Sequence, residues 1–160
     1  MIAQSHQQGN RLWFDFYTNE LNNSPKTGHK MFDEYFLCPC CHFPTLTERQ
    51  AFEICLLCNW EDDGQDDHNA DKILGGPNQD YSLSEARQNF IKYLTSYRPT
   101  DKYHFERTTV KKSDGKTVYD LVELKKTIIE KYNSALTNKN ADERKQIFKV
   151  ISELERQLNS

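Results

Sequence analysis

The stretch that decides the fold is residues 38–67, CPCCHFPTLTERQAFEICLLCNWEDDGQDD. It holds all five cysteines of the chain within twenty-one residues, and five acidic residues lie among the next nine. Two Cys-x-x-Cys pairs separated by thirteen residues are typical of a four-thiolate zinc ribbon, because each short turn can direct both sulfurs to one point. We therefore expect one structural Zn²⁺, held by Cys38, Cys41, Cys55 and Cys58.

Four thiolate ligands would complete a tetrahedron and leave no position for water, so we expect a structural centre and no catalysis at the metal. Iron takes the same ligands, and the sequence leaves that choice open. A redox pair at Cys55 and Cys58 is a competing interpretation. Cys40 lies inside the first turn, where it is a buried filler, an alternative ligand or a redox-sensitive thiol, and we favour the filler. His42 follows this turn, where a positive φ favours glycine, so it is a strained residue or a replacement ligand.

The rest of the pattern predicts an α+β fold: a small zinc-ribbon-like β module, then a helix, a β-hairpin and a C-terminal αα-hairpin. We expect a strand at 12–17 and a short hairpin at 45–54 between the cysteine turns. A helix should begin at Ser82, with Glu85 in the capping-box position, and end before Pro99. The predicted units are residues 1–35, an extension with one strand; 36–97, the cysteine module with its helix; and 98–160.

The last unit should contain a hairpin over 103–122 around a Ser113-Asp114-Gly115 turn. Two apolar stripes at helical spacing follow, and Asn140 is placed to cap the second helix. We expect the two helices to pack on the rest of the chain, although a homodimer through them is open. The stripes comprise Leu121, Leu124, Ile128, Tyr132 and Ala135, and then Ile147, Ile151, Leu154 and Leu158.

Charge is distributed unevenly along the chain. Residues 31–80 hold eleven acids against two bases, a net of −9, and residues 81–160 hold sixteen bases against eleven acids, a net of +5. The first residues show no secretory signal pattern, and no apolar run is long enough to span a bilayer. We therefore expect a cytoplasmic protein without a membrane partner, whose cysteines are kept reduced.

The acidic loop after the second cysteine turn allows several interpretations. A calcium loop fits poorly, because the EF-hand order of ligands is absent. The carboxylates could cap nearby turns and pair with Arg49, Lys72 or Arg87. They could instead form a recognition face for a basic protein, with Trp60 covering the metal site. The candidate partner-binding residues are Glu61, Asp62, Asp63, Asp66 and Asp67.

The motifs CPCC, Thr45-Leu46, EICxxC, WEDDGQDD, GGPN and SLSEARxNF stand in this order over residues 38–90. In this respect the chain resembles the bacterial cysteine-rich CPCC domain family. The resemblance implies a small zinc-ribbon-like domain and does not imply a particular activity. The family usually carries glycine after the first cysteine turn, where this chain has His42.

The leading hypothesis is a zinc-stabilised interaction module without enzymatic activity, of the kind that serves as an inhibitor, antitoxin or immunity protein for a basic partner such as a nuclease. A zinc-ribbon nucleic-acid-binding or regulatory protein is the first alternative, although the acidic module opposes phosphate binding. A thiol redox protein is the second alternative. A nucleic-acid surface would need a basic stripe in the last unit, formed by Lys111, Lys112, Lys116, Lys125, Lys126 and Lys131.

Overall fold

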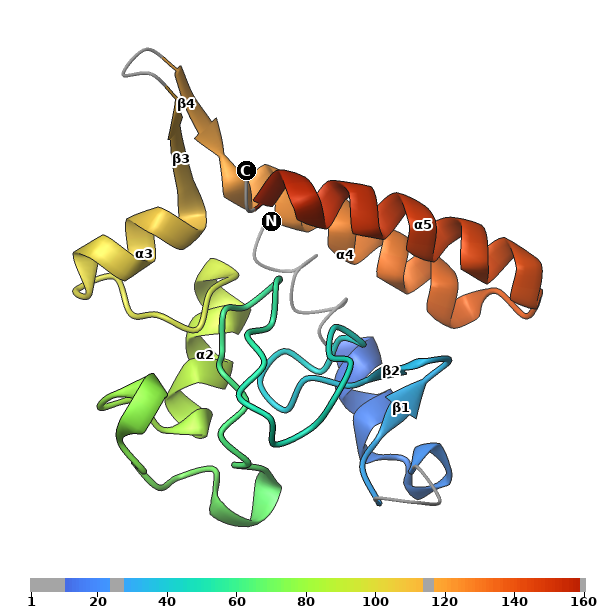
Figure 1. The fold of residues 1–160 in the computed structure, drawn as a ribbon, viewed down its shortest axis with the longest axis horizontal. Coiled ribbons are helices and arrows are strands. Elements are labelled where there is room, and N and C mark those ends of the chain that lie inside the picture. The colour runs from blue at the N-terminus through green and yellow to red at the C-terminus, as the bar shows by residue number, and fades with distance from the viewer. Residues whose placement is uncertain (1–10, 24–27, 114–116, 159–160) are drawn as a thin grey trace.

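Most of the regular structure lies in helices towards the two ends of the chain, and the cysteine-bearing middle is built from tight turns (Figure 1). The computed structural model describes residues 11–23, 28–113 and 117–158. Strand β1 (Met31–Phe32) pairs with β2 (Tyr35–Phe36), and β3 (Val110–Ser113) pairs with β4 (Thr117–Asp120), both antiparallel. The α+β class is therefore confirmed.

Residues 11–18 form a helix, so the prediction of a strand at 12–17 is wrong. Five of the six residues in LWFDFY are apolar, and such a run satisfies a two-residue and a helical period equally well. Trp13 and Tyr17 lie four residues apart, so they share one helical face, and both are buried. Leu12 and Phe14 remain nearly half exposed. A short 3-10 helix, Glu20–Asn22, follows.

The hairpin expected over 45–54 is not formed as a ladder. Isolated bridges take its place, with Phe36 opposite Leu46 and Ile54 opposite Glu61. Each bridge flanks one cysteine turn, so each turn closes its own small loop and the two turns do not share a hairpin. Two 3-10 helices follow the turns, Asp67–Asn69 and Gly76–Asn78.

Helix α2 (Leu83–Tyr93) begins where its capping residue predicts. The Ser82 side chain accepts a hydrogen bond from the Glu85 backbone N–H at 3.0 Å. The Glu85 carboxylate accepts from Arg98 at 2.8 Å. The helix ends at Leu94, which adopts a left-handed conformation with φ of 60° and donates its N–H to the Phe90 carbonyl.

The hairpin predicted over 103–122 is shorter than expected. Its first half is helix α3 (Lys102–Thr109), so the strand assignment over that part is wrong. The ladder keeps only β3 and β4, which project from the body of the molecule in Figure 1. The predicted turn extends into residues 114–116, which lie outside the described residues.

The C-terminal αα-hairpin is confirmed. Helices α4 (Leu121–Thr137) and α5 (Ala141–Leu158) run side by side along one edge of the molecule (Figure 1). Asn140 caps α5 by accepting from the Asp142 and Glu143 N–H groups, both at 3.0 Å. Four of the five residues of the α4 stripe are buried within the chain and Leu124 is partly buried, as intramolecular packing predicts.

One contiguous core joins the three predicted units. The Phe43 ring lies 5.7 Å from Trp13, 6.1 Å from Phe90 and 5.5 Å from Tyr132 between ring centroids. The N-terminal helix, the first cysteine turn, α2 and α4 therefore meet at this one side chain. The unit boundaries remain a prediction. No helix within residues 11–23, 28–113 and 117–158 is both long and apolar enough to cross a bilayer.

Candidate metal centre

The two cysteine turns have the same backbone structure. In the first turn, Cys38 N–H donates to Phe43 O and His42 N–H donates to Cys38 O, both at 2.8 Å. In the second turn, Cys55 N–H donates to Trp60 O and Asn59 N–H donates to Cys55 O, both at 2.9 Å.

The residue after each turn is left-handed. The φ angle is 70° at His42 and 71° at Asn59. Non-glycine residues enter this region at a cost, which asparagine bears better than histidine. The positive φ expected after the turns is therefore confirmed, and His42 is one of the strained residues.

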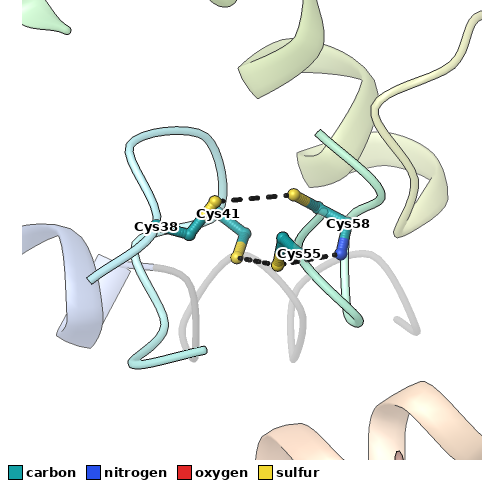
Figure 2. A group of neighbouring side chains, drawn as sticks. All are labelled: Cys38, Cys41, Cys55 and Cys58. Atoms are coloured by element: carbon teal, nitrogen blue, oxygen red, sulfur yellow. Dashed lines mark hydrogen bonds between the residues drawn. The ribbon is translucent and has the colours of Figure 1, made fainter. Parts of the chain in front are cut away.

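The turns face each other and bring four sulfurs together (Figure 2). All four Sγ atoms lie within 4.8 Å of one another. Cys38 and Cys58 are 3.7 Å apart, as are Cys41 and Cys55, measured between sulfurs. A zinc tetrahedron with Zn–S bonds of about 2.3 Å has S–S edges of about 3.8 Å. The spacing therefore fits a four-thiolate metal centre, and the pairs at 3.7 Å link one turn to the other.

Polar hydrogens converge on two of the sulfurs. Cys55 Sγ accepts from the Cys58 N–H at 3.5 Å and lies 3.0 Å from the Thr45 hydroxyl. Cys58 Sγ accepts from the Trp60 N–H at 3.4 Å. Hydrogen bonds of this kind favour the charged thiolate.

All four cysteine side chains are fully buried. Burial raises the pKa of the Cys38, Cys41 and Cys58 thiols well above the usual value. At Cys55, hydrogen bonds from the neighbouring thiols outweigh burial and lower the pKa. Burial therefore favours protonated thiols unless a cation is bound among them, because metal binding displaces the thiol protons.

Cys40 and His42 lie outside the group of four sulfurs that could hold an ion. Cys40 is buried, as a filler would be. The His42 ring is buried against Tyr17, with centroids 4.7 Å apart, and neither ring nitrogen has a hydrogen-bond partner among the described residues. Burial, assisted by the positive charge of Arg87, lowers the pKa of His42 to about 3, so the ring is neutral.

Trp60 lies two residues after Cys58, and its role as cover of the site remains a prediction. Its side chain is buried in the same core cluster as the four cysteines. The backbone carbonyl of Trp60 accepts from the Cys55 N–H and so closes the turn, and the backbone N–H of Trp60 donates to Cys58 Sγ.

The acidic loop is more internal than a recognition face requires. Asp62 is fully buried and pairs with Arg49 at 2.9 Å, where both side chains are at most 2% exposed. The Asp62 carboxylate also accepts from the N–H groups of Gln50 at 2.7 Å and Gly64 at 3.3 Å. Asp62 therefore cannot contact a partner, which corrects its predicted role. The predicted pairing with Arg49 is present.

Asp66 is also used within the fold. It accepts a hydrogen bond from the Tyr17 hydroxyl, pairs with Arg49 at 3.2 Å and caps the 3-10 helix that begins at Asp67. Burial alone would raise the pKa of Asp66, but the hydrogen bond from Tyr17 and the charge of Arg49 lower it below the usual value. Asp67 is more exposed and pairs with Arg87 at 2.8 Å.

Glu61 and Asp63 are partly exposed and lie beside Asn78. The Asn78 side chain donates to the Glu61 carbonyl at 2.7 Å and to the Asp63 carboxylate at 3.2 Å, and accepts from the Glu61 N–H at 3.2 Å. The acidic surface is therefore narrower than the sequence suggests and centres on Glu61, Asp63 and Asp67.

The sequence interpretation missed Lys125 as a buried residue. It is 2% exposed, so it cannot belong to the basic stripe of the nucleic-acid alternative. Burial lowers the pKa of Lys125 to about 8, and the nearby cysteine thiolates oppose this shift. A signal was present, because Leu121, Lys125, Ile128 and Tyr132 follow a helical period in which the lysine takes an apolar position.

The turns and their sulfur cluster define a class: small α+β proteins with a closed four-cysteine site that could hold a metal ion. Residues 36–108 match the family model described as Cysteine-rich CPCC. The match extends past the expected end near residue 90 and covers α3 up to residue 108. No curated protein and no solved structure matches the chain significantly.

Proposed function

We propose that the four cysteines hold one structural Zn²⁺ and that the protein is a non-enzymatic interaction module for a basic protein. A role as inhibitor, antitoxin or immunity protein, for example against a nuclease toxin, is the form of this function we favour. Bound zinc would cross-link the two turns and fix the loops that leave them. The reducing cytoplasm, where thiols stay free, is the compartment that suits such a centre.

The closed geometry supports a structural over a catalytic role. Four buried sulfurs at tetrahedral spacing leave a divalent ion no open position for a substrate. The 3.7 Å contacts join different turns, whereas a redox function would use Cys55 and Cys58 within one turn. A metal shared by both turns would withdraw those thiols from exchange.

The observation that carries the interaction proposal is the loop over residues 47–54. Phe52 is 56% exposed although its φ is 59°, and Ile54 is 52% exposed. A left-handed aromatic residue costs about 1 kcal/mol or more, and the fold offsets little of this cost because more than half of Phe52 stays exposed. Strained residues with exposed aromatic side chains are found where the chain displays a contact residue.

Hydrogen bonds to Glu53 and Asp62 hold this loop in one conformation. The Glu53 carboxylate accepts from the Thr47 N–H at 2.9 Å and from its hydroxyl at 2.7 Å. The buried Asp62 binds the Gln50 N–H, and the Phe52 N–H donates to the Asp62 carbonyl at 3.0 Å. Because the loop is already ordered, little entropy would be lost when a partner binds.

Charge around the loop favours a basic partner. Ile54 lies opposite Glu61 in a bridge, and Glu61 shares Asn78 with Asp63. The exposed Ile54 thus lies opposite an acidic residue and two residues from the exposed Phe52, which matches an apolar contact with a charged rim. A basic partner surface would be attracted to this rim and its association accelerated.

The test is affinity capture of the full chain from the cells that produce it, followed by identification of bound proteins by mass spectrometry. The wild type is compared with F52S/I54S and with the control L21S, which alters a side chain that is 91% exposed. We expect a basic protein in stoichiometric amount with the wild type and L21S, lost with F52S/I54S and weakened by salt. Identical protein sets from all three chains would overturn the proposed surface.

A further inference from the structure

Lys125 lies on α4 and points into the molecule, towards the second cysteine turn. Its ammonium donates to the Leu94 carbonyl at 2.6 Å and to the Asn59 side-chain oxygen at 3.4 Å. Leu94 ends α2 and Asn59 ends the second turn, and both residues are left-handed. One side chain therefore links α4, α2 and the turn that carries Cys55 and Cys58.

Two neutral oxygens do not balance a buried positive charge. Burying an unpaired ammonium costs several kcal/mol, so buried lysines are normally paired with an anion. In the part of the chain that the structure describes, no carboxylate forms an ion pair with Lys125. Asn59, which Lys125 contacts, directly follows Cys58, so the thiolates of a metal-bound centre are the anions placed to balance this charge.

The proposed metal centre, in contrast, carries an excess of buried negative charge. This inference rests on the centre proposed above, in which four thiolates around one divalent cation carry a net charge of about −2. All four sulfurs are buried, so water does not screen that charge. A buried charge of this kind is stable only with a compensating charge or hydrogen-bond donors nearby.

We propose that Lys125 is the counter-charge of the four-cysteine centre. It acts through space and through Asn59 and is not itself a ligand. The metal centre is then not confined to residues 36–108 that match the family, because α4 lies outside that segment. Metal affinity depends on α4 being in place, and by thermodynamic reciprocity metal binding strengthens the docking of α4.

The first test measures zinc affinity of the full chain by competition with a chelating dye. The variants are K125M, which keeps the length and removes the charge; K125R, which keeps the charge; and the control K126M. Lys126 is adjacent on the same helix and pairs with Glu123 at 2.7 Å near the surface. We expect K125M to weaken zinc binding about 10–100-fold, as loss of outer-shell partners of metal sites does, with K126M within about threefold of the wild type. K125R should retain most of the affinity.

The second test separates charge from packing. I128A removes a fully buried neutral side chain three residues along α4, so it loosens the same helix without changing charge. The iron-substituted protein then reports charge directly, because reduction of Fe³⁺ to Fe²⁺ makes a four-thiolate centre more negative by one charge. A nearby ammonium stabilises the reduced state, so K125M should lower the reduction potential, whereas I128A and K126M should leave it unchanged.

Three results would overturn the inference or its basis. If wild-type protein binds no metal, the proposed centre itself fails. If it binds metal and K125M matches its affinity and potential, Lys125 is not the counter-charge. If K125M loses affinity only as much as I128A does and its potential is unchanged, Lys125 acts by packing alone.

Discussion

The two cysteine turns are the same in backbone and different in surroundings. Their hydrogen bonds agree within 0.1 Å and their left-handed residues within 1°. The first turn lies among aromatic rings, with His42 against Tyr17 and Phe43 against Trp13. The second lies among polar groups, where Ser96 N–H donates to Cys58 O at 2.7 Å and Lys125 reaches Asn59. The backbone structure of each turn therefore follows from its Cys-x-x-Cys segment, whereas the surroundings of each turn depend on residues from elsewhere in the chain.

Removing the proposed metal ion should affect both turns equally and have the largest effect on stability. Structural zinc contributes roughly 10–16 kcal/mol in small zinc domains, and the buried thiols would otherwise take up protons. We expect chelation, C38S and C55S each to abolish the native near-ultraviolet circular dichroism and the buried-tryptophan emission of Trp13 and Trp60. A C38S chain that keeps its native spectrum while C55S loses it would show that the two turns are not equivalent.

Trp13 should distinguish the turns, because it packs beside the first one only. W13A removes a fully buried ring and its hydrogen bond to Asn133, at 3.1 Å. Truncation of a buried tryptophan costs about 3–5 kcal/mol. We expect that loss in denaturant unfolding of the metal-bound protein. The neighbouring control L12A, at a side chain that is 46% exposed, should change stability by less than about 1 kcal/mol.

The helices packed against the first turn should carry a pH dependence of their own. Tyr132 contacts Phe43 and donates to the Glu155 carboxyl at 2.6 Å. Burial raises the pKa of Glu155 from 4.5 to about 7. A raised carboxyl pKa stabilises the fold fully below the unfolded value, and this contribution is lost as the pH rises through the folded value.

We therefore expect the wild type to lose stability relative to E155Q between pH 5 and pH 8, by on the order of 1–3 kcal/mol. Thermal unfolding of both chains at fixed zinc concentration measures the difference, and the comparison cancels the acid sensitivity of the metal centre. A difference that stays constant across this range would show that Glu155 is ionised throughout.

Replacing the residue after each turn, Asn59 or His42, by glycine should have the smallest effect on stability. N59G removes left-handed strain and one long hydrogen bond, so we expect its stability to lie within about 0.5 kcal/mol of the wild type. H42G relieves the same strain but loses ring contacts to Tyr17 and Phe14, so it should be less stable by about 1–2 kcal/mol. Equal changes at both positions, measured by denaturant unfolding, would contradict the contrast between the two environments.

Features encoded over a few residues could be predicted from the sequence. The cysteine spacing identified the sulfur cluster, and Ser82 and Asn140 marked helix starts, because capping depends on neighbours three residues away. The prediction of a strand at 12–17 was wrong, because this short apolar run fits both the strand and the helix period. Only the residues that pack against it decide which of the two forms.

The charged groups were harder to place, since burial of a charge depends on distant partners. Asp62 needs Arg49, Asp66 needs Tyr17 and Lys125 needs the second turn, and none of these pairs is set by local spacing. The −9 net charge of residues 31–80 consequently overstates the acidity of the surface, because the carboxylates of Asp62 and Asp66 form ion pairs with Arg49 inside the fold.

The burial of Cys40 gives the protein an internal reporter. Its thiol is 1% exposed and is not one of the four clustered sulfurs. A thiol-specific alkylating reagent can reach it only when the first turn opens, so the alkylation rate measures how often that opening occurs. If the four clustered thiols hold the proposed ion, coordination protects them as well as burial, so the order in which the five thiols react would separate opening of the turn from release of the ion.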